Sequence, residues 1–178
     1  MFFETDRLIA RPWTLGEAKY ALRMYGDPEV MRFLGRSGAG AVIGSVEEMR
    51  ERLGKAIEKY GSSSQGYIYA ALELKSSGEP IGTALLKPLE LSSGEMAMDE
   101  IEIGWHLARD YWGKGLGTEC GFGVMAYGFS LGLKELHAIA YPENKASLRI
   151  MQKIGMSYVR STDRYYGVTA EHYLARRE

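Results

Sequence analysis

The sequence predicts an α+β (mixed α/β) fold, with a central mixed, mostly antiparallel sheet of about seven strands and helices on both faces. Three observations carry this prediction. Two helical segments come early, three strands joined by short turns follow, and strands then alternate with helices before a closing hairpin. No internal repeat or linker divides the 178 residues, so we expect a single domain spanning residues 1–178.

Capping signals and short turns locate the elements of the first half of the chain. Asp27 can cap a helix whose first position is Pro28, and Ser45 with Glu48 has the spacing of a capping box. Alternating apolar and polar residues between glycine- and serine-containing turns mark the strands. The expected elements are a strand at 7–12, helices beginning near 28 and 46, and strands at 67–74, 80–89 and 100–107.

Strands and helices alternate in the second half. The expected elements are a helix over 116–131, a strand over 136–141, a helix over 145–154, and closing strands near 157–161 and 167–176. The first of these helices contains Gly121, Gly123 and Gly128, each of which costs up to about 1 kcal/mol relative to alanine. We therefore expect close packing against the sheet to stabilise this helix.

Composition and charge argue against several classes of protein. The formal net charge of −1 gives no global electrostatic reason to bind nucleic acid or an anionic membrane, and leaves only a local basic patch open. The single cysteine, Cys120, cannot form an intrachain disulfide, and we expect it in the core. No apolar run reaches the ~18 residues of a membrane span, and the charged start lacks the apolar run of a signal peptide. We expect a cytoplasmic protein that binds neither nucleic acid nor membranes.

A glycine-rich segment, YWGKGLGTE, precedes the helix expected at residue 116. Its spacing matches neither the nucleoside-triphosphate loop nor the dinucleotide fingerprint. Free backbone N–H groups at the start of a helix can nevertheless bind phosphate oxygens, and Gly115 and Gly117 lack the Cβ atoms that would keep such oxygens away. A tight strand-to-helix turn that binds nothing explains the spacing equally well.

Two motifs in order resemble the GCN5-related N-acetyltransferases (GNAT family). They are GWHLARDYWGKGLGTE and, further along the chain, PENKASLRIMQKIGM. The end segments ETDRLIARPW and HYLAR are similar to those of the branch that contains the ribosomal-protein alanine and serine N-acetyltransferases (RimJ/RimL-like), so the resemblance covers almost the whole chain. It implies a GNAT-like fold and direct transfer of an acetyl group from acetyl-coenzyme A to a primary amine in a ternary complex, without a metal. The amine would belong to a protein N-terminus or a small molecule.

The resemblance also implies where the cofactor binds. Backbone amides of residues 114–118 would hold its pyrophosphate, and its pantetheine arm would lie between the strands that end near Leu107 and Tyr141. Asn144 would contact the arm and Ser147 would lie near the thiol, although helix capping alone can explain both residues. The expected cofactor-binding residues are Trp105, His106, Leu107, Lys114, Gly115, Leu116, Gly117, Thr118, Asn144 and Ser147.

Acetyl transfer to an amine requires a proton acceptor, for which Glu102 is the candidate. Strand alternation puts Glu102 on one face with Gly104 and His106, and cover by helices would make the carboxylate a stronger base. The alternative is a carboxylate on a solvated strand face. Family members often use an acidic residue at this position as the base or to hold water. Many also use a tyrosine to protonate the departing thiolate, but this chain has Met151 there, so the role falls to Ser147 or to no residue.

The acceptor side is less specified by the sequence. Such folds place acceptor contacts on the early helices and on the loop at residues 35–44, and we expect Tyr165, Tyr166 and Tyr173 in the same cleft. A tyrosine cluster is equally compatible with a homodimer contact.

The three histidines have no metal-ligand spacing, which indicates structural roles. A catalytically silent module that binds acyl-coenzyme A and regulates a partner is the alternative function.

Overall fold

The computed structural model describes residues 1–35, 41–60 and 64–177. Its strands are β1 (Phe3–Glu4), β2 (Leu8–Pro12), β3 (Ile68–Leu74), β4 (Glu79–Glu90), β5 (Met96–Leu107), β6 (Glu135–Ala140), β7 (Ser157–Thr162) and β8 (Ala170–Arg176). Its helices are α1 (Ala18–Tyr25), α2 (Pro28–Met31), α3 (Val46–Tyr60), α4 (Leu116–Ser130) and α5 (Lys145–Lys153), with short 3₁₀ helices at Leu15–Glu17 and Arg109–Tyr111.

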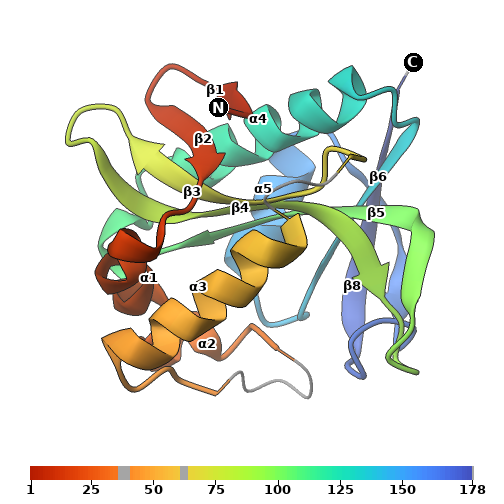
Figure 1. Ribbon diagram of the computed structural model, residues 1–178. Coiled ribbons are helices and arrows are strands. Elements are labelled where there is room, and N and C mark those ends of the chain that lie inside the picture. The colour runs from red at the N-terminus through yellow and green to blue at the C-terminus, as the bar shows by residue number, and fades with distance from the viewer. Residues whose placement is uncertain (36–40, 61–63, 178) are drawn as a thin grey trace.

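The eight strands form one sheet in the order β1-β2-β3-β4-β5-β6-β8-β7. Every neighbouring pair is antiparallel except β5 and β6, which run parallel. In Figure 1, α1 and α3 cover one face of the sheet and α4 covers the other. Each face has its own apolar cluster, one shared with α1–α3 and the other with α4 and α5. The predicted mixed, mostly antiparallel sheet with helices on both faces is therefore confirmed.

The local capping predictions hold in part. The Asp27 carboxylate accepts a hydrogen bond from the Glu29 N–H (2.8 Å), as expected for the cap of α2. The Ser45 hydroxyl accepts one from the Glu48 N–H (3.1 Å), but the Glu48 carboxylate accepts from the Gly44 N–H (3.0 Å) and does not return to Ser45. Only one half of the predicted capping box is therefore formed.

The glycines of α4 lie where neighbouring elements approach closely. A Cβ at Gly123 would lie 2.4 Å from Cε2 of Phe3 on β1, and one at Gly128 would lie 3.0 Å from the methyl carbons of Leu136 on β6. A Cβ at Gly121 would instead meet Ile154, which follows α5, at 3.2 Å. The predicted close packing is confirmed, and its partners include β1 and the end of α5 as well as the middle of the sheet.

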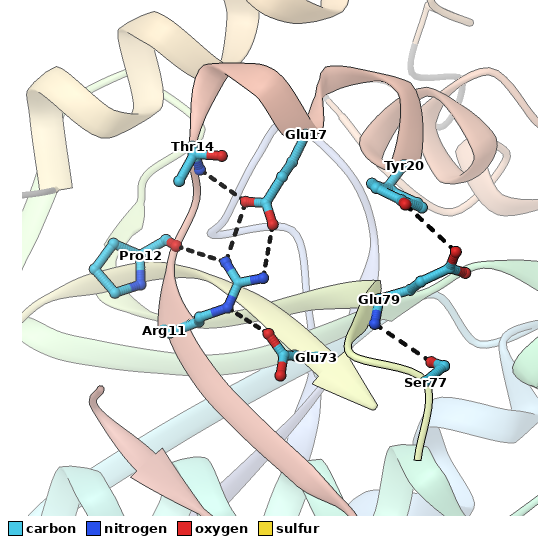
Figure 2. Close-up of polar contacts among 8 residues, drawn as sticks. All are labelled: Arg11, Pro12, Thr14, Glu17, Tyr20, Glu73, Ser77 and Glu79. Atoms are coloured by element: carbon cyan, nitrogen blue, oxygen red, sulfur yellow. Dashed lines mark hydrogen bonds and ion pairs between the residues drawn. The ribbon is translucent and has the colours of Figure 1, made fainter. Parts of the chain in front are cut away.

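Arg11 connects β2 to its surroundings through charged contacts (Figure 2). Its Nε donates to Glu73 on β3 (2.6 Å), and its Nη2 donates to Glu17 (2.6 Å). The Glu17 carboxylate also accepts from the Thr14 N–H (2.9 Å), which fixes the turn between β2 and α1.

No helix in the described part of the chain is long and apolar enough to cross a membrane.

Candidate active site

Two adjoining cavities open where β5 and β6 separate. The parallel strands pair at Glu102 and His137, and no later position of either described strand pairs with the other. A glycine-loop cavity of about 530 Å³ is lined by the segment before α4 and by the first turn of α4. A carboxylate cavity of about 320 Å³ contains Glu102. The lining residues shared by the two cavities are Phe33, Leu34, Trp105, His106, Asn144 and Ser147.

The start of α4 gives the glycine-loop cavity its chemistry. Gly113 and Gly115 have φ values of 73° and 77°, a left-handed conformation that glycine adopts without steric cost. Gly115 is the N-cap, so the N–H groups of the first turn of α4 have no partner within the helix and carry the positive end of its dipole. A Cβ at Gly117 would lie 2.8 Å from Cδ1 of Ile150, so packing against α5 also favours glycine there.

Most of the residues predicted to bind the cofactor meet in this cavity. Trp105, His106, Leu107, Gly115, Leu116, Gly117, Thr118, Asn144 and Ser147 all line it. Lys114 is the exception, because its carbonyl oxygen accepts a hydrogen bond from Nη1 of Arg7 (3.0 Å) and its ammonium lies over the Tyr111 ring. Lys114 therefore does not line the cavity, although Gly113 and Gly115 on either side of it do.

A row of cations on α5 also lines the glycine-loop cavity and was not predicted. Lys145, Arg149 and Lys153 recur every four residues, so they share one side of the helix. Among the described residues, none of the three forms an ion pair with a carboxylate. These cations could have been found from the sequence, because they recur every four residues along a predicted helix. Together with the start of α4, these side chains make the cavity attractive to a ligand with several phosphates.

Glu102 is buried on β5 with only 8% of its surface exposed, so the alternative of a solvated strand face is wrong. Its Oε2 accepts two hydrogen bonds, one from the Tyr166 hydroxyl (2.6 Å) and one from Nζ of Lys87 (3.0 Å). No described residue donates to Oε1. The carboxylate is thus held by one oxygen, and the other is available to a water molecule or a substrate.

Tyr166 adopts a strained backbone conformation in this site. Its φ of 57° is unusual for a residue with a side chain, and its N–H donates to the Glu90 carbonyl (3.0 Å). Burial, reinforced by the charge of Glu102, raises the pKa of the Tyr166 hydroxyl well above its usual range, so the hydroxyl stays protonated and acts as a donor. Of the three tyrosines predicted for this cleft, Tyr166 lies in it, whereas Tyr165 packs against His172 and Tyr173 against Tyr158.

Residues 7–157 match the family model described as an acetyltransferase (GNAT) domain. The chain belongs to the GNAT acetyltransferase family. It is 29% identical to the uncharacterized N-acetyltransferase YoaA of Bacillus subtilis over 85% of this chain and 80% of the relative.

Solved structures support the GNAT fold. A GNAT-family acetyltransferase from Bacillus anthracis superimposes with a TM-score of 0.78 at 21% identity, over 99% of this chain and 98% of that one. RimL, a ribosomal alpha-N-protein acetyltransferase in complex with coenzyme A, superimposes with a TM-score of 0.73 at 15% identity, over 97% and 95% of the two chains.

The junction of the two cavities in this GNAT protein contains polar groups at the start of α5. The Asn144 side chain accepts a hydrogen bond from the Ser147 N–H (3.2 Å), which is the predicted helix cap. Both side chains also line both cavities. Met151 is 2% exposed and lines the carboxylate cavity, where it offers no proton to a leaving group. Ser147 is therefore the hydroxyl available at the junction.

The early helices and the segment that follows α2 form part of the wall of the carboxylate cavity. Tyr25 of α1 and Arg52 of α3 line it together with Phe33, Leu34 and Gly35. The predicted acceptor loop continues through residues 36–40, which lie outside the described residues. The early helices and the start of this loop thus line the cavity that contains Glu102, together with residues of β3 to β6, α5 and β8.

His137, His172 and Cys120 are buried, whereas His106 lines both cavities. Nδ1 of His106 lies 3.0 Å from the Tyr25 hydroxyl, and burial, followed by the charge of Lys87, lowers the pKa of His106 to about 3, so its ring is neutral. His137 and His172 stack with Nδ1 and Nε2 2.9 Å apart. Cys120 is fully buried, which raises the pKa of its thiol to about 12 and confirms its place in the core. The described residues contain no group of three or more potential ligands that could hold a metal ion.

Proposed function

We propose that this GNAT protein transfers an acetyl group from acetyl-coenzyme A to a primary amine by direct transfer in a ternary complex. The amine belongs to a protein N-terminus or to a small molecule. One observation carries the proposal: a cavity suited to phosphates meets, at Trp105 and Ser147, a second cavity that contains a buried carboxylate with a free oxygen. A donor and an acceptor bound in the two cavities would meet at this junction.

The residues of the glycine-loop cavity suit coenzyme A. Its pyrophosphate would accept hydrogen bonds from the backbone N–H groups of Gly115 and of the first turn of α4, residues 116–118, and its remaining phosphate would lie near the cations of α5. The amide groups of its pantetheine arm would pair with the backbone of β5 that β6 leaves free after Glu102. When bound, acetyl-coenzyme A supplies the thioester whose acetyl group is transferred.

Glu102 acts as the proton acceptor in this proposal. An aliphatic amine with a pKa of about 8 to 10 is mostly an ammonium at neutral pH and must lose a proton before it can attack. Oε1 of Glu102 takes this proton, directly or through a water molecule, while Lys87 and Tyr166 hold Oε2 in place. As the amine nitrogen bonds to the acetyl carbon and the carbon–sulfur bond breaks, the nitrogen loses its remaining extra proton. The Ser147 hydroxyl donates a proton to the departing sulfur and regains one from that nitrogen, directly or through a water molecule, so the products are the amide and the free thiol.

An acceptor screen tests the proposed reaction. The purified protein is incubated with acetyl-coenzyme A and a panel containing a peptide with a free N-terminus, its N-terminally blocked form, a polyamine, an aminoglycoside and free amino acids. We expect at least one acceptor to gain an acetyl group, located by mass spectrometry, in an amount equal to the thiol released. Binding of acetyl-coenzyme A without turnover across the panel would contradict the proposal and favour a silent acyl-coenzyme A-binding module, for which Met151 is the supporting observation.

A further inference from the structure

We propose that Arg7 is a positioning residue that holds the glycine loop, residues 113–115, in the orientation that binds the cofactor's pyrophosphate. The inference rests on the proposed function, because it assigns a role to a residue outside the cavity through the phosphate site. Arg7 precedes β2 and lies far from the loop in sequence. It does not line either cavity, so its effect on the cofactor must pass through its contacts.

Arg7 joins the glycine loop, the start of α4 and the N-terminal segment. Its Nη1 donates to the Lys114 carbonyl (3.0 Å), and its Nε donates to Oε2 of Glu119 (2.6 Å). The Arg7 N–H also donates to Oε1 of Glu119 (2.7 Å), which accepts a further bond from the Thr5 hydroxyl (2.6 Å). One guanidinium group therefore bridges the loop to the helix that follows it.

The bond to Lys114 fixes the direction of the next amide. In a trans peptide the C=O and the following N–H point in opposite directions, and the chain contains no cis peptide among its described residues. When the Lys114 carbonyl points at Arg7, the Gly115 N–H points away from Arg7. Gly115 lines the cavity, whereas Lys114 does not. Rotation of this peptide changes ψ of Lys114 and φ of Gly115, and Gly115 has no side chain to oppose the change. The Arg7 bond therefore selects one orientation of the peptide.

Arg7 also neutralises an unfavourable charge. Glu119 lies in the first turn of α4, where a carboxylate stabilises the helix dipole but repels a phosphate at the same helix end. The hydrogen bonds from Arg7 and Thr5 hold this carboxylate against the N-terminal segment, and its pKa is lowered by them despite partial burial. Without Arg7, an uncompensated negative charge would remain beside the phosphate site.

Titration calorimetry with coenzyme A tests this role, with Arg11→Ala as the matched control. Arg11 lies four residues later and also forms two ion pairs, with Glu17 and Glu73 (Figure 2). Its hydrogen bonds go to these two residues and to Pro12, none of which belongs to the loop. We expect Arg7→Ala to weaken coenzyme A binding about tenfold, the effect of losing one charge-assisted contact. Arg7→Lys keeps the positive charge but lacks the planar guanidinium that donates to Lys114 and Glu119 together. We expect this variant to lose less coenzyme A affinity than Arg7→Ala. Arg11→Ala should stay within twofold of wild type.

A truncated donor separates positioning from general destabilisation. S-acetyl-pantetheine lacks the pyrophosphate, so Arg7→Ala should raise the KM for acetyl-coenzyme A and leave the KM for S-acetyl-pantetheine unchanged. If Arg7→Ala does not fold, Arg7→Lys carries the same test. Equal losses with both donors, or coenzyme A affinity within twofold of wild type in Arg7→Ala and Arg7→Lys, would overturn the inference. Failure of the wild-type protein to bind coenzyme A would instead refute the proposed function and this role with it.

Discussion

Replacing Glu102 with glutamine removes the proposed proton acceptor while preserving its shape. In the native site, Lys87 and Tyr166 both donate to Oε2. Only the amide oxygen of glutamine can accept these two bonds, because its nitrogen is a donor. The NH₂ group is therefore left at the position of Oε1. A donor at this position cannot take a proton from an acceptor amine or from a bridging water.

The size of the effect follows from this geometry. A positioned general base contributes about 10²- to 10⁴-fold to a rate. Glutamine retains the bonds that organise Lys87 and Tyr166, so we expect only the base contribution to be lost, about 10²- to 10³-fold in kcat/KM at pH 7. Without the base, only acceptor that is already neutral reacts. For an α-amine with a pKa of about 8, the neutral fraction rises roughly tenfold from pH 7 to pH 9, and the deficit should shrink accordingly.

Thiol release measured from pH 6.5 to 9.5 provides the assay. The matched control is Glu100→Gln, since Glu100 lies two residues earlier on β5 and pairs with Arg164 (3.1 Å) outside both cavities. We expect the control to stay within about twofold of wild type at every pH, as for a surface ion pair. The reasoning is refuted if Glu102→Gln stays within threefold of wild type at pH 7, or if its deficit is the same at all pH values.

Three further predictions concern packing, reactivity and pH. Gly54→Ala should raise the free energy of unfolding by up to about 1 kcal/mol, because alanine favours the helix and its Cβ would meet only Leu15, at 3.8 Å. Gly123→Ala should lower the free energy of unfolding by about 1–2 kcal/mol, because its Cβ would lie 2.4 Å from Phe3. Urea unfolding of both variants measures this, and equal shifts would contradict the packing argument. Since burial raises the pKa of the Cys120 thiol to about 12, a thiol reagent at pH 8 should label the protein only after unfolding, and rapid labelling of the folded protein would show an accessible thiol. Burial, followed by the charge of His137, lowers the pKa of His172 to about 4. Below pH 6.5 the unfolded chain therefore binds a proton at His172 that the folded chain does not. The free energy of unfolding should fall as the pH is lowered from 6.5 to 4.5, by up to about 1.4 kcal/mol per pH unit. Constant urea midpoints over this range would be inconsistent with that prediction.

The sequence predicts the elements whose signals are local. The cap at Asp27 and the alternation along β5 are contained in short segments, and both appear in the structure. The helix α1 was missed because its N-cap, Glu17, makes no side-chain cap bond and the helix depends on burial of residues such as Met24 and Tyr25. The strand β1 has only two residues and is defined by its pairing with β2 and its packing against α4.

The same distinction applies to the candidate site. Glu102 and the glycine segment could be found because strand alternation and a local glycine pattern mark them. Their partners could not, because Lys87 and Tyr166 reach Glu102 across 15 and 64 residues, and Arg7 reaches Lys114 across 107. Such contacts arise from strand order and register, which a single sequence does not specify.

Isothermal titration of the purified protein with acetyl-coenzyme A, with ATP and NAD as parallel ligands, tests the central claim most directly. The account predicts selective micromolar binding of acetyl-coenzyme A, because in the proposed complex the pyrophosphate, the remaining phosphate and the pantetheine arm would each have partners in the glycine-loop cavity. A well-folded protein that does not bind acetyl-coenzyme A, or that binds ATP or NAD in preference to it, would contradict the account.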